Sequence, residues 1–139
     1  METLIFLKKV PLFSSFELEE LLKLKEITET VSCGAGDFVF HEGDSGNRAY
    51  IIVSGSVEVV KADNDGETII ATLEKPAYFG EMAIIENQPR SASIRVKTDC
   101  VLLAVDGLEF RNMMKTNAEL AFNVVKVFSG RIRSMMHRT

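Results

Sequence analysis

The hydrophobic residues of this 139-residue chain change their spacing twice, and this change limits what the chain can fold into. Near the N-terminus, Leu18, Leu21 and Leu22 follow a helical period, whereas Val57 and Val59 alternate with a polar residue, as in a strand with one buried face. Toward the C-terminus the helical period returns. The pattern therefore predicts a β region between two helical ends.

Turn-forming residues divide the central region into short segments. They are clusters of Gly, Ser, Asp and Asn at residues 34–37, 42–46, 54–55 and 63–66. Such regular breaks are typical of an all-β sandwich or barrel. We expect one domain over residues 1–139: a helical N-terminus over 1–26, eight short strands forming a barrel over 27–105, and C-terminal helices over 106–139.

Capping-box spacing predicts where three helices begin. The pairs are Ser14 with Glu17, Asp106 with Glu109, and Thr116 with Glu119.

The last of these helices, expected to reach about His137, is apolar on more than one side. We expect the stripe that contains Phe122 and Val125 to lie on the barrel as a lid. Leu120 and Val124 would then remain exposed and favour association with a second copy.

Composition and charge exclude several classes of protein. The hydrophobic share of 46% and the charged share of 26% fit a globular domain rather than a disordered chain. A net charge of -4 disfavours sequence-independent binding of DNA or RNA. Because the chain also lacks a long apolar run and a secretory signal pattern, we expect a soluble, cytoplasmic protein that does not bind membranes.

The sequence also argues against a metal site and against catalysis. Two cysteines, Cys33 and Cys100, cannot supply the four thiolates of an all-cysteine zinc or iron–sulfur site, and free thiols are expected. Two histidines are too few for a cupin-type metalloenzyme, and no nucleophile–base pair is recognisable. We therefore expect neither a metal nor a cofactor, and no enzymatic activity.

The stretch 79–93 carries the most chemical information. Gly80 and the helix-compatible residues after it predict a short helical insertion whose free N–H groups, from Gly80 to Ala83, converge on one spot. Such a spot can bind an anion.

Arg90 belongs to the same strand face as Ala92, Ile94 and Val96, which by alternation points into the barrel. A buried guanidinium needs an anionic partner, because an unpaired charge in the interior is costly. Two partners are open: an internal ion pair with a nearby glutamate, Glu81 or Glu86, or a bound phosphate. The residues alone do not decide between them.

The run Phe79-Gly80-Glu81-Met82-Ala83, followed by Pro89-Arg90-Ser91-Ala92, resembles the phosphate-binding cassette of cyclic nucleotide-binding domains. These domains occur in bacterial catabolite-activator-type regulators, protein kinase A regulatory subunits and cyclic-nucleotide-gated channels. The resemblance extends over essentially the whole chain. It implies a mainly β fold, an eight-stranded jelly roll (double-stranded β-helix) with an N-terminal helix and two C-terminal helices.

The resemblance also implies roles for individual residues. Arg90 would pair with the exocyclic oxygens of a cyclic phosphate, and Glu81 would accept the ribose 2′-hydroxyl. The short helix that begins near Gly80 would add backbone donors, and Ser91 a hydroxyl near the phosphate or base. The full set implied to bind the ligand is Phe79, Gly80, Glu81, Met82, Ala83, Arg90, Ser91 and Ala92.

Further residues would form the wall and lid of the pocket. The resemblance implies that Val59 and Ala71 line the purine side, and that Arg131 and Met135 reach the ligand from the last helix. Activator-type relatives have two hydroxyl residues where this chain has Met135 and its neighbour, so the base preference is open on that side. Ser91, rather than a threonine, favours cAMP over cGMP.

The expected function is a cyclic nucleotide sensor, a regulatory module that couples binding of cAMP, or of cGMP, to movement of its C-terminal helix. A homodimer through that helix is also expected, as in the activator class. Two alternatives stay open at this point. The first is a degenerate jelly-roll interaction domain that binds no nucleotide, and the second is the sensor part of a transcription regulator without its DNA-binding part.

Overall fold

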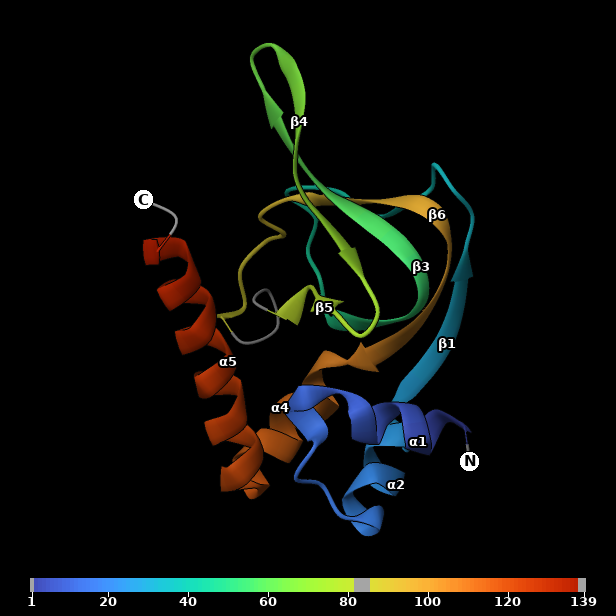
Figure 1. The fold of residues 1–139 in the computed structure, drawn as a ribbon, viewed down its shortest axis with the longest axis vertical. Helices are drawn as coiled ribbons and strands as arrows, with labels where there is room; N and C mark the ends of the chain where they lie inside the picture. Colours follow the sequence, from blue (N-terminus) through green and yellow to red (C-terminus); the bar gives the residue numbers. More distant parts are fainter. Residues whose placement is uncertain (1, 82–85, 138–139) are drawn as a thin grey trace.

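The computed structural model describes residues 2–81 and 86–137, except for the side chains of residues 127, 128, 131, 132, 134, 135 and 137. It shows an antiparallel β-sheet with helices at one end and along one side (Figure 1). Helices from both ends of the chain meet below the sheet, α5 runs along its side, and the hairpin of β3 and β4 extends away at the opposite end.

The described residues contain six strands: β1 (Thr28–Cys33), β2 (Phe38–Phe40), β3 (Arg48–Asp63), β4 (Gly66–Glu74), β5 (Tyr78–Phe79) and β6 (Ser93–Asp106). The central order is β1-β6-β3-β4, while β2 pairs with β6 and β5 with β3. Every pairing is antiparallel. The mainly β prediction is confirmed.

The expected eight short strands are not found, because β3 and β6 are long and continuous. The turn predicted at Ser54 and Gly55 is instead a bulge within β3, where the register with β6 shifts. Gly55 has a φ of +84°, and a Cβ there would lie 2.2 Å from the Asp99 carbonyl oxygen. Glycine therefore bends this strand without ending it.

The helices whose whole length lies within the described residues are α1 (Glu2–Lys9), the 3-10 helix η1 (Pro11–Phe13), α2 (Leu18–Glu26), α4 (Gly107–Thr116) and α5 (Ala118–His137). One predicted cap is confirmed, since the Asp106 side chain accepts the Glu109 N–H at 3.0 Å.

The other two predicted caps are wrong by a few residues. The hydroxyl of Ser14 donates to the Pro11 carbonyl and closes η1, so α2 begins only after Glu17. The cap of α5 is Asn117, whose side chain accepts the Leu120 N–H at 3.0 Å, while Thr116 ends α4.

The buried apolar residues form two clusters, one on each side of the sheet. The first joins the N-terminal helices to α4 and α5 and includes Phe13, Phe16 and Phe110. The second fills the inside of the barrel and includes Ile52 and Val57. The second cluster forms the inner wall against which the site described below is built.

The face of α5 that packs on the domain is the opposite of the one predicted. Leu120 and Val124 are buried in the first cluster, at 0% and 7% exposure, whereas Phe122 and Val125 are 58% and 60% exposed. Helix α5 packs against η1 and α4. Leu120 and Val124 are four residues apart, so they lie on the same side of the helix and can both take part in that contact. A helix that is apolar on two sides does not reveal from its sequence which side is covered.

Two expectations about composition can be compared with the described residues. Cys33 and Cys100 are free thiols that lie opposite each other in the β1–β6 register, and burial raises the pKa of both. Within the described part of the chain, no helix is both long and apolar enough to cross a membrane.

Candidate functional site

A cavity of about 590 Å³ opens between the barrel and the segment that precedes β6. We call it the Arg90 cavity. Its apolar wall includes Phe40, Val59, Leu73, Phe79 and Ile94, and its polar side includes Glu81, Arg90 and Ser91. An apolar wall with a few polar groups is the usual composition of a small-molecule site.

Arg90 is the most deeply placed charge of this cavity, with only 5% of its surface exposed. Its two terminal nitrogens donate to main-chain carbonyls, Nη1 to Gly80 at 2.8 Å and Nη2 to Arg48 at 2.7 Å. The guanidinium also lies 4.0 Å from the centre of the Phe40 ring, within the range of a cation–π contact. The side chain of Arg90 is thus buried as predicted, but Arg90 precedes β6, which begins at Ser93, so strand alternation is not what orients it.

The guanidinium of Arg90 is not neutralised within the described residues. Their ion pairs join Arg48 to Glu29, Lys61 to Glu42, and Arg95 to Glu58 and Glu67. Arg90 takes part in none of them, and its Nε is buried without a hydrogen-bond partner. Burial lowers the pKa of Arg90, against the opposing influence of Tyr50, Asp44 and Glu81. A buried positive charge in this condition favours the entry of an anion.

The main chain of Arg90 is fixed by the turn that follows β2. The Arg90 N–H donates to the Asp44 carbonyl, and the Gly43 N–H donates to the Arg90 carbonyl, both at 2.8 Å. Gly46 in the same turn leaves room for the guanidinium, because a Cβ there would lie 2.1 Å from Arg90 Nε. The turn therefore sets both the position of Arg90 and the space for its side chain.

Gly80 and Glu81 form the opposite edge of the cavity. Gly80 has a φ of +83°, a conformation that favours glycine, and its carbonyl receives the Arg90 side chain. Glu81 follows with helical backbone and is 8% exposed, so a buried carboxylate lines the same cavity as the guanidinium and acts to raise the pKa of Arg90. The alternative of an internal ion pair with Glu81 or Glu86 is not observed among the described residues.

Comparison with known proteins identifies the family to which this chain belongs. Residues 30–117 match the family described as "Cyclic nucleotide-binding domain". The chain belongs to the cyclic nucleotide-binding domain family. The matched segment contains every described strand except the first two residues of β1, and it contains the whole Arg90 cavity apart from Pro11.

The related proteins are named as regulators. A cAMP-dependent protein kinase regulatory subunit from Schizosaccharomyces pombe is 35% identical over 117 residues, which is 84% of this chain and 28% of the relative. One from Blastocladiella emersonii is 44% identical over 93 residues, 66% of this chain and 23% of the relative. The chain thus spans about a quarter of the length of these relatives.

Solved structures agree with the fold. The catabolite activator protein of Thermus thermophilus has a TM-score of 0.82 at 26% identity, covering 92% of this chain and 61% of that one. The regulatory subunit of a "cAMP-independent protein kinase A" from Trypanosoma brucei has a TM-score of 0.80 at 29% identity, covering 93% of this chain and 47% of that one. The fold of this chain is therefore similar both to a kinase regulatory subunit and to an activator protein.

The structure brings most of the predicted cassette residues to one place. Those that line the cavity are Val59, Phe79, Gly80, Glu81, Arg90, Ser91 and Ala92. Ala71, predicted as pocket wall, pairs with Val59 in the β3–β4 register but is not among the lining residues, although Leu73, two residues further along β4, is. Met82 and Ala83, and the side chains of Arg131 and Met135, lie outside the described residues.

Three contributors to the site were not predicted from the sequence. They are Phe40, which contacts the guanidinium, Arg48, whose carbonyl accepts from it, and Gly46, which leaves it space. A carbonyl acceptor leaves no trace in the residue type, and Gly46 looks like any other turn glycine. Only the pairing of distant segments reveals them.

Proposed function

We propose that this cyclic nucleotide-binding domain binds a cyclic nucleotide, cAMP in preference to cGMP, in the Arg90 cavity and transmits binding through α5. One observation carries the proposal: Arg90 is buried at the end of an apolar cavity and has no ion-pair partner among the described residues. A bidentate guanidinium matches the two exocyclic oxygens of a cyclic phosphate in shape and charge.

The other cavity residues fit the remainder of a nucleotide. Glu81 follows Gly80 at the cavity edge, where its carboxylate is suited to accept a ribose 2′-hydroxyl. The apolar wall at Val59 and Leu73 is suited to a purine ring. Ser91 adds a hydroxyl to the cavity lining, and serine rather than threonine at this position is the basis for preferring cAMP.

Names of the relatives support the proposal without deciding the ligand. A structure titled as the regulatory domain of Toxoplasma gondii protein kinase A with cAMP has a TM-score of 0.74 at 24% identity, a likeness of fold alone. The Trypanosoma brucei relative described as cAMP-independent favours a second candidate, a regulatory domain of this shape that does not respond to cAMP. The two candidates differ in whether cAMP binds at all.

A titration by calorimetry separates them. Purified protein is titrated with cAMP, cGMP and 5′-AMP. We expect both cyclic nucleotides to bind more tightly than 5′-AMP, because one buried guanidinium compensates about one negative charge and a dianionic 5′-phosphate would bring a second charge into the interior. Of the two cyclic nucleotides, cAMP should bind more tightly, as proposed from Ser91. Absence of heat with both cyclic nucleotides would favour the second candidate.

Helix α5 is the proposed output element and the proposed surface of a homodimer. Phe122, Val125 and Met136 are all exposed and recur at spacings that place them along one side of the helix. An apolar stripe of this kind favours pairing with a second copy. Changing Phe122 to Glu should therefore lower the apparent mass in sedimentation experiments, and a monomeric wild-type protein at all concentrations would contradict the dimer.

A further inference from the structure

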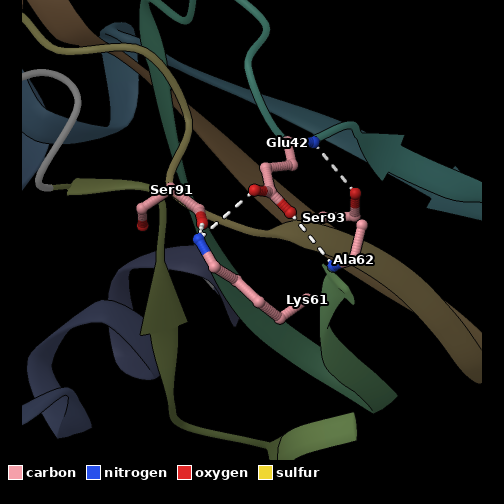
Figure 2. A network of polar contacts seen from close by, with 5 residues as sticks. All are labelled: Glu42, Lys61, Ala62, Ser91 and Ser93. Carbon is pink, nitrogen blue, oxygen red and sulfur yellow. Dashed lines mark hydrogen bonds and ion pairs between the residues drawn. The ribbon is translucent and has the colours of Figure 1, made fainter. Parts of the chain in front are cut away.

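The segment 89–93, which carries Arg90, is held by more than its main-chain contacts. Figure 2 shows a polar network between this segment, the turn after β2 and the part of β3 that enters the hairpin. Its five members are Glu42, Lys61, Ala62, Ser91 and Ser93. Apart from Ser91, none of them lines the Arg90 cavity, so the network lies behind the site and not within it.

Lys61, on β3, contacts both segment 89–93 and the turn after β2. Its Nζ donates to the Ser91 carbonyl at 2.7 Å and lies 3.3 Å from Glu42 Oε2. The Ser91 carbonyl is separated from Arg90 by a single peptide unit, so the contact fixes the main chain directly next to the binding residue. A charged donor to a carbonyl is also stronger than a neutral one.

Glu42, in the turn after β2, bonds to β3 and to the end of segment 89–93. Its Oε1 accepts the Ala62 N–H at 3.2 Å, and its own N–H donates to Ser93 Oγ at 2.9 Å. The Ala62 N–H and the Lys61 ammonium lower the pKa of Glu42, so the carboxylate stays charged at neutral pH. The turn after β2 is therefore bonded to Arg90 itself, to Ser93 after it, and to β3 as well.

We propose that Lys61 and Glu42 are positioning residues, which hold segment 89–93 against β3 and so keep the Arg90 guanidinium in the cavity before a ligand arrives. The proposal rests on the proposed function, because it takes Arg90 as the residue that binds the anion.

Lys61 and Glu42 are both partly exposed. This supports a role in positioning segment 89–93 rather than a large contribution to the free energy of unfolding. The side chains of Lys61 and Glu42 are 47% and 33% exposed, and ion pairs of this kind add little to folding. Their bonds to main-chain atoms, however, order a segment that has only Ser93 in a strand. When the segment is already ordered, less conformational entropy is lost on ligand binding.

The first test uses substitutions at Lys61. We expect Lys61→Met to weaken cyclic nucleotide binding about fivefold, through loss of a preorganised Arg90. Lys61→Arg, which keeps a charged donor, should restore affinity to within about twofold. The matched control is Glu29→Gln, which removes the exposed ion pair with the Arg48 side chain at 3.1 Å. Glu29 does not line the cavity and the Arg48 carbonyl that accepts from Arg90 is retained, so affinity should stay unchanged.

The second test needs no nucleotide. The amides of Gly43 and Arg90 both donate across the junction between the turn and segment 89–93. If Lys61 holds that junction, hydrogen exchange at these two amides should become about tenfold faster in Lys61→Met and stay unchanged in Glu29→Gln.

The two tests separate the outcomes. If the wild type binds no cyclic nucleotide, the proposed function fails, and amide exchange alone still decides whether Lys61 positions Arg90. Unchanged exchange at Gly43 and Arg90 in Lys61→Met overturns the positioning role, whatever happens to affinity. Faster exchange with unchanged affinity also overturns it, because the order of the segment would then not matter for binding.

Discussion

Arg90 and Arg95 are five residues apart, and the structure treats their charges in opposite ways. Arg95, in β6, pairs through Nε with Glu58 at 3.3 Å and through Nη1 with Glu67. Among the described residues, Arg90 donates to two main-chain carbonyls, and its Nε has no hydrogen-bond partner there. The hydrogen bonds with Glu67 and Glu58 raise the pKa of Arg95, whereas burial lowers the pKa of Arg90.

The difference supports the proposal that Arg90 binds a ligand, whereas Arg95 serves the fold. Arg95 finds its anions on neighbouring strands, as expected of a structural ion pair. Arg90 is more buried and has a greater need of an anion, yet the described residues supply none by direct contact. An anion from solution would neutralise Arg90, whereas Arg95 already has its two carboxylate partners.

The largest expected effect comes from removing the Arg90 guanidinium. Truncating one side of a buried charge pair costs about 2–5 kcal/mol, so Arg90→Ala should weaken cyclic nucleotide binding by about thirtyfold or more. Arg95→Ala is the control, and it should change affinity by less than about threefold because its partners lie outside the cavity. Calorimetry on both variants checks this, and equal losses would remove the distinction between the two arginines.

The next effect concerns the carboxylate beside Arg90. Glu81→Ala should lose a hydrogen bond to a charged acceptor, about 1.5–3 kcal/mol, which corresponds to about tenfold in affinity or more. The same variant should bind cAMP and its 2′-deoxy analogue alike, whereas the wild type should prefer cAMP. If the wild type binds the two ligands equally well, Glu81 does not contact the ribose.

The contrast between the two arginines was only partly predictable from sequence. Alternation correctly placed Ile94 and Val96 in the barrel cluster, whereas Arg90 is buried although it lies before the start of β6 at Ser93. The cap at Asp106 was equally local and was predicted correctly. Such features depend on residues close together in the chain, where periodicity and side-chain chemistry act directly.

Features that depend on distant segments were missed or misassigned. The bulge at Gly55 depends on the Asp99 carbonyl across the sheet, and the buried side of α5 depends on η1 and α4. The partners of Arg90, the Phe40 ring and the Arg48 carbonyl, likewise come from other strands. Tertiary contacts of this kind have no signal in local sequence pattern.

A smaller effect is expected from adding one methyl group beside Arg90. In Gly46→Ala the new Cβ would lie 2.1 Å from Arg90 Nε and 2.2 Å from its Cζ, so the guanidinium must move while the fold persists. We expect cyclic nucleotide affinity to fall about five- to tenfold, because a displaced donor pair no longer matches the phosphate.

The control for this substitution is Gly34→Ala in the turn after β1, outside the cavity lining, where the nearest atom to the added Cβ, Asp37 Oδ2, lies at an ordinary contact distance of 3.5 Å. It should leave affinity unchanged. Circular dichroism on both variants establishes that the fold is intact. A Gly46→Ala protein that is folded and binds like the wild type would mean that the position of the Arg90 side chain in the structure is not the one used for binding.

The smallest effect is expected on the Arg95 side. Glu67→Gln removes the more exposed of the two carboxylates and leaves Glu58, which is the more buried, still paired with Arg95. Because exposed ion pairs contribute little, Tm should fall by no more than about 2 °C. Cyclic nucleotide affinity should not change, since Glu67 lies on β4 outside the cavity lining. Thermal unfolding and calorimetry on the same preparation check both statements. A loss of affinity above about threefold would show that the β3–β4 hairpin and its Arg95 contacts also shape the cavity, and Arg95 could then no longer serve as the purely structural counterpart of Arg90.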